Sequence, residues 1–379
     1  MVAVSLAMFV MALGEELWMR FIPKYLEALG APVVAIGFYG STKDFLDGVY
    51  QYPGGWIADH YGRRRALLLF VGLAAIGYAI IGVASWWPIV ILGLVFTMAW
   101  TSMASPTLFA VIGDALPKNR RAMGFSVQAI LRRLLIVIAP TLGGLLIARW
   151  GVQVGVRNGL ILSVLLAGLT LTVVSRVRLV LPDGGGGITI RGVWDRLPGP
   201  LRRLLVSDIF IRTSEALVDV FLVIYSLNVI GISPPQYGVL VGVQMATAIA
   251  CYLPIARLAD RIARKPFVIA TFLAFSAFPL AVIASRSFSA LVLAFVIGGL
   301  RELGEPARKA MIVDLAEPAV RARSVGLYYF IRSIAIAPAA TVGGLLWRSA
   351  PAIPFIVAGT VGLIGTALFS LTVDERYAG

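Results

Sequence analysis

Long apolar stretches separated by short polar segments run along the whole chain. A helix that crosses a bilayer needs about 20 mostly apolar residues, and twelve windows of the sequence meet that condition. The pattern therefore predicts an all-α membrane protein with twelve transmembrane helices. The windows cover approximately residues 2–22, 34–58, 66–85, 88–113, 122–148, 158–175, 204–229, 236–256, 266–285, 289–313, 324–347 and 352–373.

One connection between the windows is much longer than the others. Residues 176–203 contain Pro182, four consecutive glycines at 184–187 and several arginines. Because proline and glycine disfavour helix, we expect this segment to be a cytoplasmic linker between two six-helix bundles, 1–175 and 204–379.

The two predicted bundles align with each other at an offset near 200 residues. Glycine, proline and aspartate positions recur in register, which predicts pseudo-symmetric, parallel six-helix repeats about an axis along the membrane normal. The matches are Gly30, Gly37, Pro53 and Asp59 with Gly231, Gly238, Pro254 and Asp260, and Pro106, Asp114, Gly143 and Gly144 with Pro306, Asp314, Gly343 and Gly344.

Composition and charge agree with a membrane location. Hydrophobic residues make up 59% of the chain, the mean hydropathy is +0.90 and the net charge is +14. The basic residues gather at the ends of apolar windows, mostly on the side of the linker, which indicates the positive-inside rule and no nucleic-acid partner. We expect a multi-pass protein of the plasma membrane, monomeric and in contact with membrane lipids, with both termini in the cytoplasm.

A short charged turn lies between the second and third windows. Residues 55–65 read Gly-Trp-Ile-Ala-Asp-His-Tyr-Gly-Arg-Arg-Arg, and a weaker copy with an aspartate and basic residues follows at 256–265. Such side chains at helix ends pair with each other or with lipid head groups, and these pairs can switch between two states. We expect a gating role; the alternative is a simple positive-inside anchor.

This doubled turn resembles the loop signature of the major facilitator superfamily, G-x-x-x-D-[RK]-x-G-[RK]-[RK]. The resemblance implies two helical bundles that expose a central site alternately to each side, with Asp59 latching the outward-facing state. His60 stands where the family has Arg or Lys, and Ala256 and Ala263 replace both glycines of the second copy. The implied gating residues are Gly55, Asp59, Gly62, Arg63, Arg64, Arg65, Asp260, Arg261 and Arg264.

The fifth window contains Ala-Pro-Thr-Leu-Gly-Gly at 139–144. It resembles the end of the antiporter signature of the same family, G-P-x-x-G-G, with Ala139 in place of a glycine. Proline bends a helix and glycine allows close helix approach, so Pro140, Gly143 and Gly144 predict a bend sealed against another helix. The alternative is an ordinary helix contact through small residues.

Charged residues inside the windows are costly, at least about 2.5–3.5 kcal/mol each near the bilayer centre, and so indicate function. Some have partners one helical turn away: Glu16 with Arg20, Lys43 with Asp47, Asp208 with Arg212, and Arg301 and Arg308 with Glu305. Arg132, Arg133 and Arg332 have no acid at that spacing, which leaves acids on other helices or an anionic substrate as partners. The expected substrate cavity comprises Arg20, Lys43, Arg132, Arg133, Arg212, Glu215, Arg301, Glu305, Arg308 and Arg332.

Three acids are candidates for proton coupling. Asp44 and Asp47 are three residues apart and compete for the single ammonium of Lys43, while Glu16 lies in the first window. Carboxylates in this situation are suited to bind and release a proton. The arginine signature of the family's fourth helix, often tied to proton transfer, is absent, because Trp100, Thr101 and Ser102 occupy that stretch.

No motif of a soluble enzyme competes with this interpretation. The chain has one histidine, one cysteine and no ATP-binding loop, so we expect no catalysis, no cofactor and no metal site. The sequence thus predicts a transporter that exports a small molecule in exchange for protons. The alternatives are a proton symporter for a polar or anionic nutrient, and a lipid flippase on the same scaffold.

Overall fold

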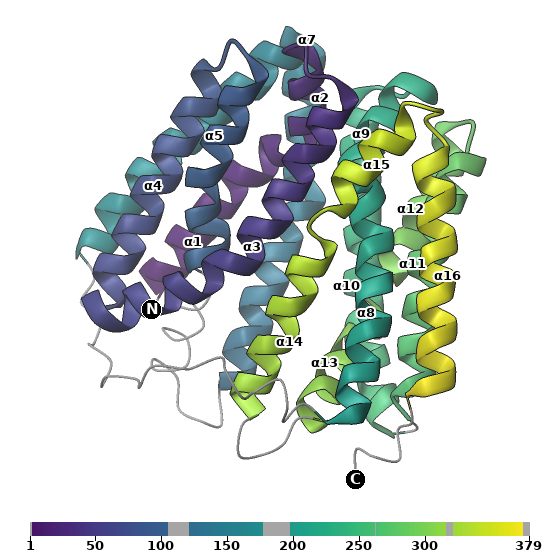
Figure 1. Ribbon diagram of the computed structural model, residues 1–379. Coiled ribbons are helices and arrows are strands. Elements are labelled where there is room, and N and C mark those ends of the chain that lie inside the picture. The colour runs from purple at the N-terminus through teal and green to yellow at the C-terminus, as the bar shows by residue number, and fades with distance from the viewer. Residues whose placement is uncertain (1, 105–120, 177–197, 262, 316–320, 374–379) are drawn as a thin grey trace. The chain divides into compact units, whose positions relative to one another are not determined.

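The computed structural model describes residues 2–104, 121–176, 198–261, 263–315 and 321–373 (Figure 1). The described residues of the first half form helices whose bounds follow the apolar windows closely. These are α1 (Val2–Trp18), a 3-10 turn (Met19–Phe21), α2 (Ile22–Ala28), α3 (Val33–Tyr61), α4 (Arg63–Val83), α5 (Trp87–Met98), a π-helical turn (Ala99–Met103) and α7 (Arg121–Arg176). α7 contains two of the windows, separated at Gly151, whose φ of 80° is not helical.

The second half follows the same plan. Its elements are α8 (Gly199–Val218), a 3-10 turn (Asp219–Phe221), α9 (Leu222–Ile224), a π-helical turn (Tyr225–Val229), α10 (Pro234–Arg261), α11 (Lys265–Ala284), α12 (Phe288–Leu300), α13 (Glu305–Asp314), α14 (Arg321–Ile336), α15 (Ala339–Trp347) and α16 (Ile353–Thr372).

The described residues of the twelve predicted windows are mostly helical, and the described part of the chain contains no strand. The prediction of an all-α fold is therefore confirmed. Five helical segments among the described residues are long and apolar enough to cross a membrane on length and composition alone. α3 and α8 are as long as these segments, but each carries several charged residues. Some of these residues belong to the candidate site.

The described contacts divide the chain into two compact units that do not follow the sequence halves. Unit 1 comprises residues 1–32, 45–186 and 233–242; unit 2 comprises 33–44, 187–232 and 243–379. The first part of α3 therefore packs with helices of the second half, and the first part of α10 packs with helices of the first half. The boundaries predicted for the two bundles and the linker stay a prediction, and residues 177–197 of the linker lie outside the described residues.

Glycines allow the closest helix approaches in both units. A Cβ on Gly143 of α7 would overlap the carbonyl oxygen of Leu17 in α1, and a Cβ on Gly343 of α15 would overlap the carbonyl oxygen of Leu217 in α8. Gly143 and Gly343 are 200 residues apart in the sequence, and so are Leu17 and Leu217. The repeat detected in the sequence is thus also a repeat of packing within each unit.

Unit 2 has an apolar layer beneath its charged site. α8, α11 and α16 run side by side (Figure 1), and Phe272 and Phe369 meet edge to face with their centroids 5.1 Å apart. Leu201 and Ile211 of α8 are fully buried in the same layer. This packing fixes the position of α8, and the charged residues Asp208, Arg212 and Glu215 follow Leu201 along the same helix.

Candidate coupling and substrate site

Three charged residues of α8 lie on one face of that helix. Asp208, Arg212 and Glu215 are spaced by four and three residues, which aligns their side chains along the helix. Asp208 is fully buried, whereas the side chains of Arg212 and Glu215 keep 17% and 29% of their exposure. Burial therefore decreases along this row from Asp208 to Glu215.

A break between α12 and α13 brings three more charged residues to that face. The helix stops at Leu300 and restarts at Glu305, and the Gly304 N–H donates to Thr271 Oγ1 of α11 at 2.5 Å. A Cβ on Gly304 would also overlap the Phe267 carbonyl oxygen, so only glycine permits this approach. The break changes the direction in which Arg301 points relative to Glu305.

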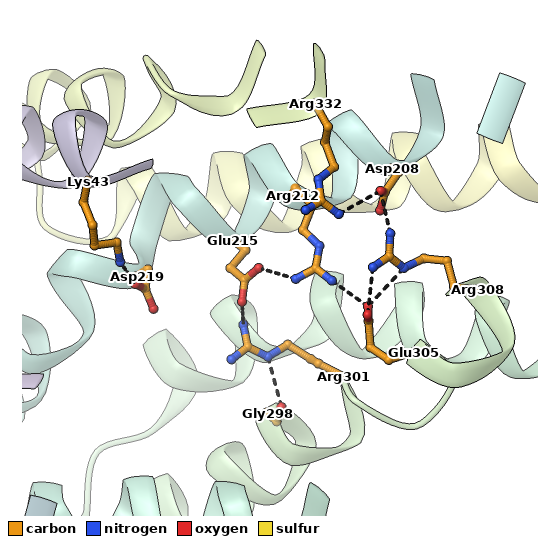
Figure 2. Close-up of polar contacts among 10 residues, drawn as sticks. All are labelled: Lys43, Asp208, Arg212, Glu215, Asp219, Gly298, Arg301, Glu305, Arg308 and Arg332. Carbon is orange, nitrogen blue, oxygen red and sulfur yellow. Dashed lines mark hydrogen bonds and ion pairs between the residues drawn. The ribbon is translucent and has the colours of Figure 1, made fainter. Parts of the chain in front are cut away.

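The charged residues of the two segments form one continuous network (Figure 2). Arg212 donates from Nη1 to Glu215 Oε2 at 2.9 Å and from Nη2 to Glu305 Oε1 at 2.5 Å. Arg301 Nη1 lies 3.3 Å from Glu215 Oε1, and its Nε donates to the Gly298 carbonyl at 3.0 Å. Arg308 donates to both oxygens of Glu305, from Nε at 3.1 Å and from Nη2 at 2.7 Å. Acids and guanidinium groups thus alternate along the network.

Asp208 is the acceptor at which three helices of unit 2 meet. Its Oδ2 accepts from Arg308 Nη1 at 2.6 Å, from Tyr328 Oη at 2.9 Å and from Arg332 Nη1 at 3.2 Å, while its buried Oδ1 has no hydrogen-bond partner among the described residues. Tyr328 and Arg332 are one turn apart on α14. The acid therefore ties α14 and α13 to α8.

Aromatic rings lie close to guanidinium groups of the network, as Arg301 and Arg332 show. Arg301 lies over Phe275 and Phe278, with its Cζ 5.1 Å and 4.5 Å from the ring centroids. Arg332 lies 4.7 Å from the centroid of Tyr329. Stacking of this kind adds about 0.5–2 kcal/mol and restricts the rotation of the side chain.

Removing one member of such a network is costly. The side chains of Arg308, Glu305 and Asp208 keep 1%, 6% and 0% of their exposure. Breaking a buried ion pair by removing one partner typically costs about 3–5 kcal/mol, because the other charge stays behind unpaired. Asp208, Glu305 and Arg308 are therefore a rigid part of the site.

The pairing differs from the one that helical spacing predicts. Lys43 was expected to pair with Asp47, but its Nζ contacts Asp219 Oδ2 at 3.2 Å, as a separate pair in Figure 2. Likewise Arg301 contacts Glu215 and not Glu305, since the helix break removes the i,i+4 geometry between them. The short-range pairs Glu16 with Arg20, at 3.6 Å, and Glu305 with Arg308 are present.

Unit 1 holds a second group of intramembrane acids. Asp47 Oδ1 accepts from Ser102 Oγ at 2.6 Å, and Glu15 Oε1 accepts from Thr101 Oγ1 at 2.7 Å. Both hydroxyls belong to the π-helical turn after α5, a rare conformation that occurs mostly at functional sites. Among the described residues no Lys or Arg forms an ion pair with Asp47.

Glu16 and Asp44, the other predicted proton-coupling residues, lie in different surroundings. Glu16 is buried, and its contact is Arg20. Asp44 is half-buried and is the last residue of the α3 segment that belongs to unit 2, directly before the segment that belongs to unit 1. The structure therefore distributes the predicted proton and cavity residues over both units.

The expected gate is described in part. Gly62 joins α3 to α4 with φ of 81°, a conformation in which other residues are strained. Arg64 donates to the Ser175 carbonyl, and Arg264 pairs with Asp314. The side chains of Asp59, Asp260, Arg261 and, in the cavity set, Arg132 lie outside the described residues, so the latch between Asp59 and the arginines stays a prediction.

The Pro140 to Gly144 segment lies in a close contact within unit 1. A Cβ on Gly144 would lie 2.5 Å from the Pro234 carbonyl oxygen, and a Cβ on Gly238 would lie 2.5 Å from the Pro140 carbonyl oxygen. The small residues of α7 and of the first part of α10 therefore face each other. This contact is compatible with both the antiporter interpretation and the simple packing one.

Several residues of the site were not singled out from the sequence. Asp208 was expected to pair with Arg212, but its carboxylate accepts from Arg308, Tyr328 and Arg332. Nothing local distinguishes Asp219 or Glu15 as central, and Thr101 and Ser102 are ordinary small polar residues in the sequence. The repeat register carries a usable signal, since Glu15 and Glu215 are 200 residues apart, as are Thr101 and Arg301. Both acids contact the residue at the corresponding position of their own half.

Comparison with known proteins gives consistent matches over the whole chain. The model of the Major Facilitator Superfamily matches residues 4–203 and 204–379. An uncharacterised MFS-type transporter from Methanocaldococcus jannaschii is 23% identical over 370 residues, covering 95% of this chain and 91% of that protein. A multidrug resistance protein, MdtH, from Photorhabdus laumondii is 22% identical over 358 residues, covering 90% and 86%.

Solved structures show the same fold at low sequence identity. A POT family transporter in complex with 5-aminolevulinic acid superimposes with a TM-score of 0.80 at 15% identity, covering 99% of this chain and 96% of that one. The nucleoside transporter NupG gives a TM-score of 0.77 at 14% identity, covering 97% and 98%. At these identities the likeness concerns the fold alone.

Proposed function

The chain belongs to the major facilitator superfamily, and from that membership we propose that it exports a small molecule in exchange for protons. Membership makes it a multi-pass membrane transporter and not an enzyme. Proton coupling and the outward direction are our inference from the site and from the sequence.

The observation that carries the proton-coupling proposal is the contact between Asp47 and Ser102. Asp208 and Glu305 have guanidinium partners that favour the charged carboxylate, whereas the partner of Asp47 in the described part of the chain is a neutral hydroxyl at 2.6 Å. A hydroxyl can donate to a carboxylate and can also accept from the protonated acid. Asp47 is therefore suited to alternate between the two protonation states.

In the proposed cycle the proton on Asp47 and the substrate favour different states of the carrier. Protonation removes a charge that is expensive inside the membrane, and this shifts the population between inward-facing and outward-facing states. Release of the proton on the opposite side restores the charge and the original preference. In this cycle the guanidinium-rich network of unit 2 takes no part in carrying the proton.

Two observations support export. The segment at 139–144 resembles part of the antiporter signature and lies at a close helix contact, and a relative with 22% identity bears the name multidrug resistance protein. The competing direction, import of a polar or anionic nutrient with protons, has one observation in its favour, the guanidinium groups of Arg212, Arg301, Arg308 and Arg332 in the described network of unit 2. Simultaneous measurement of proton and compound movement in proteoliposomes separates export from import.

The test uses purified protein in proteoliposomes that enclose a pH-sensitive dye. With an imposed pH gradient, a panel of cationic, neutral and anionic compounds is added on either side, and proton movement is recorded together with compound movement. Opposite directions of proton and compound support antiport, and equal directions overturn export. Asp47→Asn should abolish pH-driven accumulation, whereas Glu27→Gln, which removes a carboxylate paired with Lys24 in α2, should leave it intact. Full accumulation by Asp47→Asn would refute its role as the proton carrier.

A further inference from the structure

Among the described residues, the linked ion pairs of unit 2 contain unequal numbers of positive and negative side chains. Its linked members are four guanidinium groups, those of Arg212, Arg301, Arg308 and Arg332, and three carboxylates, those of Asp208, Glu215 and Glu305. One positive charge is therefore in excess within this linked set. Because an uncompensated charge inside a membrane protein is expensive, the excess calls for an additional anion.

Arg332 is the member of the network that carries this excess. It is the third donor on Asp208 Oδ2, at 3.2 Å, after Arg308 at 2.6 Å and Tyr328 at 2.9 Å. Its side chain keeps 17% of its exposure, against 1% for Arg308. Nη1 is its only atom with a hydrogen bond to the part of the chain that the structure describes, so Nη2 has none there.

The guanidinium of Arg332 is held in a fixed orientation. Asp208 accepts from Nη1, and the centroid of the Tyr329 ring, on the same helix, lies 4.7 Å from Cζ. A guanidinium restrained in this way presents its remaining donors in a fixed fork, which matches the oxygens of a carboxylate or a phosphate. The side chain is thus organised before any anion arrives.

We propose that Arg332 is the subsite for an anionic group of the transported molecule, a carboxylate or a phosphate. This inference rests on the proposed transport function and names the substrate class. The bound anion accepts hydrogen bonds from Nη2 and makes the linked set electrically neutral. Arg212 is not the subsite, because its two terminal nitrogens already donate to Glu215 and Glu305.

The same count predicts that Arg332 can be removed without loss of the fold. Arg332→Gln leaves three guanidinium groups with three carboxylates, and Asp208 keeps Arg308 and Tyr328 as donors. The variant is therefore suitable for binding measurements. Arg348→Gln is the matched control, because Arg348 is an exposed arginine of the same unit and lies outside the network.

The test measures binding to the full-length protein in lipid nanodiscs, at one pH and without a gradient. Two pairs of probes are used: hippurate with its uncharged amide hippuramide, and phenyl phosphate with phenol. Binding of each compound is measured by isothermal titration calorimetry and by thermal shift. We expect the wild type and Arg348→Gln to bind an acid of at least one pair in preference to its uncharged partner. In Arg332→Gln that preference should fall by about ten- to a hundredfold, the loss expected for a charge-assisted hydrogen bond.

The outcomes separate this inference from the transport proposal. Equal binding of acid and neutral partner by the wild type, or unchanged acid preference in Arg332→Gln, overturns the subsite. Preference for the carboxylate pair or for the phosphate pair identifies the group that the subsite accepts. The binding assay contains no pH gradient and therefore does not depend on proton coupling. Acid-selective binding that requires Arg332 would support the subsite even if Asp47→Asn transports normally. Loss of the subsite hypothesis, in turn, would leave the proton-coupling proposal to the proteoliposome assay.

Discussion

Thr101 Oγ1 donates to Glu15 Oε1 at 2.7 Å, and Arg301 Nη1 contacts Glu215 Oε1 at 3.3 Å, 200 residues further along for both partners. The two halves of the chain thus keep the same contact with different chemistry: a hydroxyl is the donor in unit 1 and a guanidinium is the donor in unit 2. The repeat has retained the position of the acid and changed the charge of the side chain facing it. This asymmetry is consistent with protons being handled in unit 1 and anions in unit 2.

Replacing Thr101 by Val removes the hydroxyl while keeping the shape of the side chain. Glu15 keeps only 7% of its exposure, so the loss of a donor to its carboxylate should lower the free energy of unfolding by about 1–3 kcal/mol. Thr97→Val is the control, because Thr97 Oγ1 donates to the Leu94 carbonyl of its own helix. Denaturation midpoints of both variants in detergent check this; equal midpoints would show that the contact with Glu15 is energetically neutral.

Arg308 and Arg332 both contact Asp208 but should differ greatly in importance for stability. Arg308→Gln leaves Asp208 and Glu305 buried with one guanidinium partner fewer each, and we expect the free energy of unfolding to fall by about 3–5 kcal/mol. Arg332→Gln should cost far less, since it brings the linked set to neutrality. Thermal unfolding of the two variants measured side by side is the check, and a larger loss for Arg332→Gln would contradict the charge count.

Gly143 should not tolerate even one additional methyl group. A Cβ at this position would overlap the Leu17 carbonyl oxygen, so Gly143→Ala must separate α7 from α1 and should cost about 1–3 kcal/mol. Gly168, on the same α7, is exposed and has no atom within 4 Å of such a Cβ. Gly168→Ala should therefore be neutral or stabilise the protein by about 0.5–1 kcal/mol. Melting temperatures and reconstituted transport of the two alanine variants are the check. If both variants lose stability equally, α7 is sensitive to any substitution and the close contact at Gly143 is not the cause.

Lys43 and Asp219 connect the first part of α3 to the segment after α8 within unit 2. Lys43→Asp places two carboxylates together and should impair transport, and the double exchange Lys43→Asp with Asp219→Lys should restore part of it. Because both side chains are partly exposed, at 24% and 34%, the coupling free energy should be about 1 kcal/mol or less. A double-mutant cycle on stability and transport rate checks this; additive effects of the two changes would mean that the contact has no influence.

The candidate site shows where reasoning from the sequence succeeds. The charged residues that it places inside the membrane, such as Arg212, Glu305 and Arg308, do form a network, because charges in apolar helices must find partners whatever the details of the fold. The pairs within one helical turn, Glu16 with Arg20 and Glu305 with Arg308, are also recovered, because they depend on helix geometry alone.

The partners that the sequence did not predict depend on packing between helices. Lys43 has an acid one turn away in Asp47, yet it contacts Asp219, because the first part of α3 packs with unit 2. Arg301 has Glu305 at helical spacing, yet the break at Gly304 directs it to Glu215. No local pattern reveals which of two acceptable acids a neighbouring helix will present.

By itself the sequence determined the number and approximate positions of the apolar helices, the internal repeat and the presence of charges that need partners, because hydropathy, helix spacing and register are local properties of a chain. Only the tertiary structure decided that Asp47 accepts from a hydroxyl while Asp208 accepts from three donors, and that four guanidinium groups and three carboxylates are linked among the described residues of unit 2. The physical reason is that a buried charge takes the partner that helix packing brings within about 3 Å of it, and packing is a property of the whole fold.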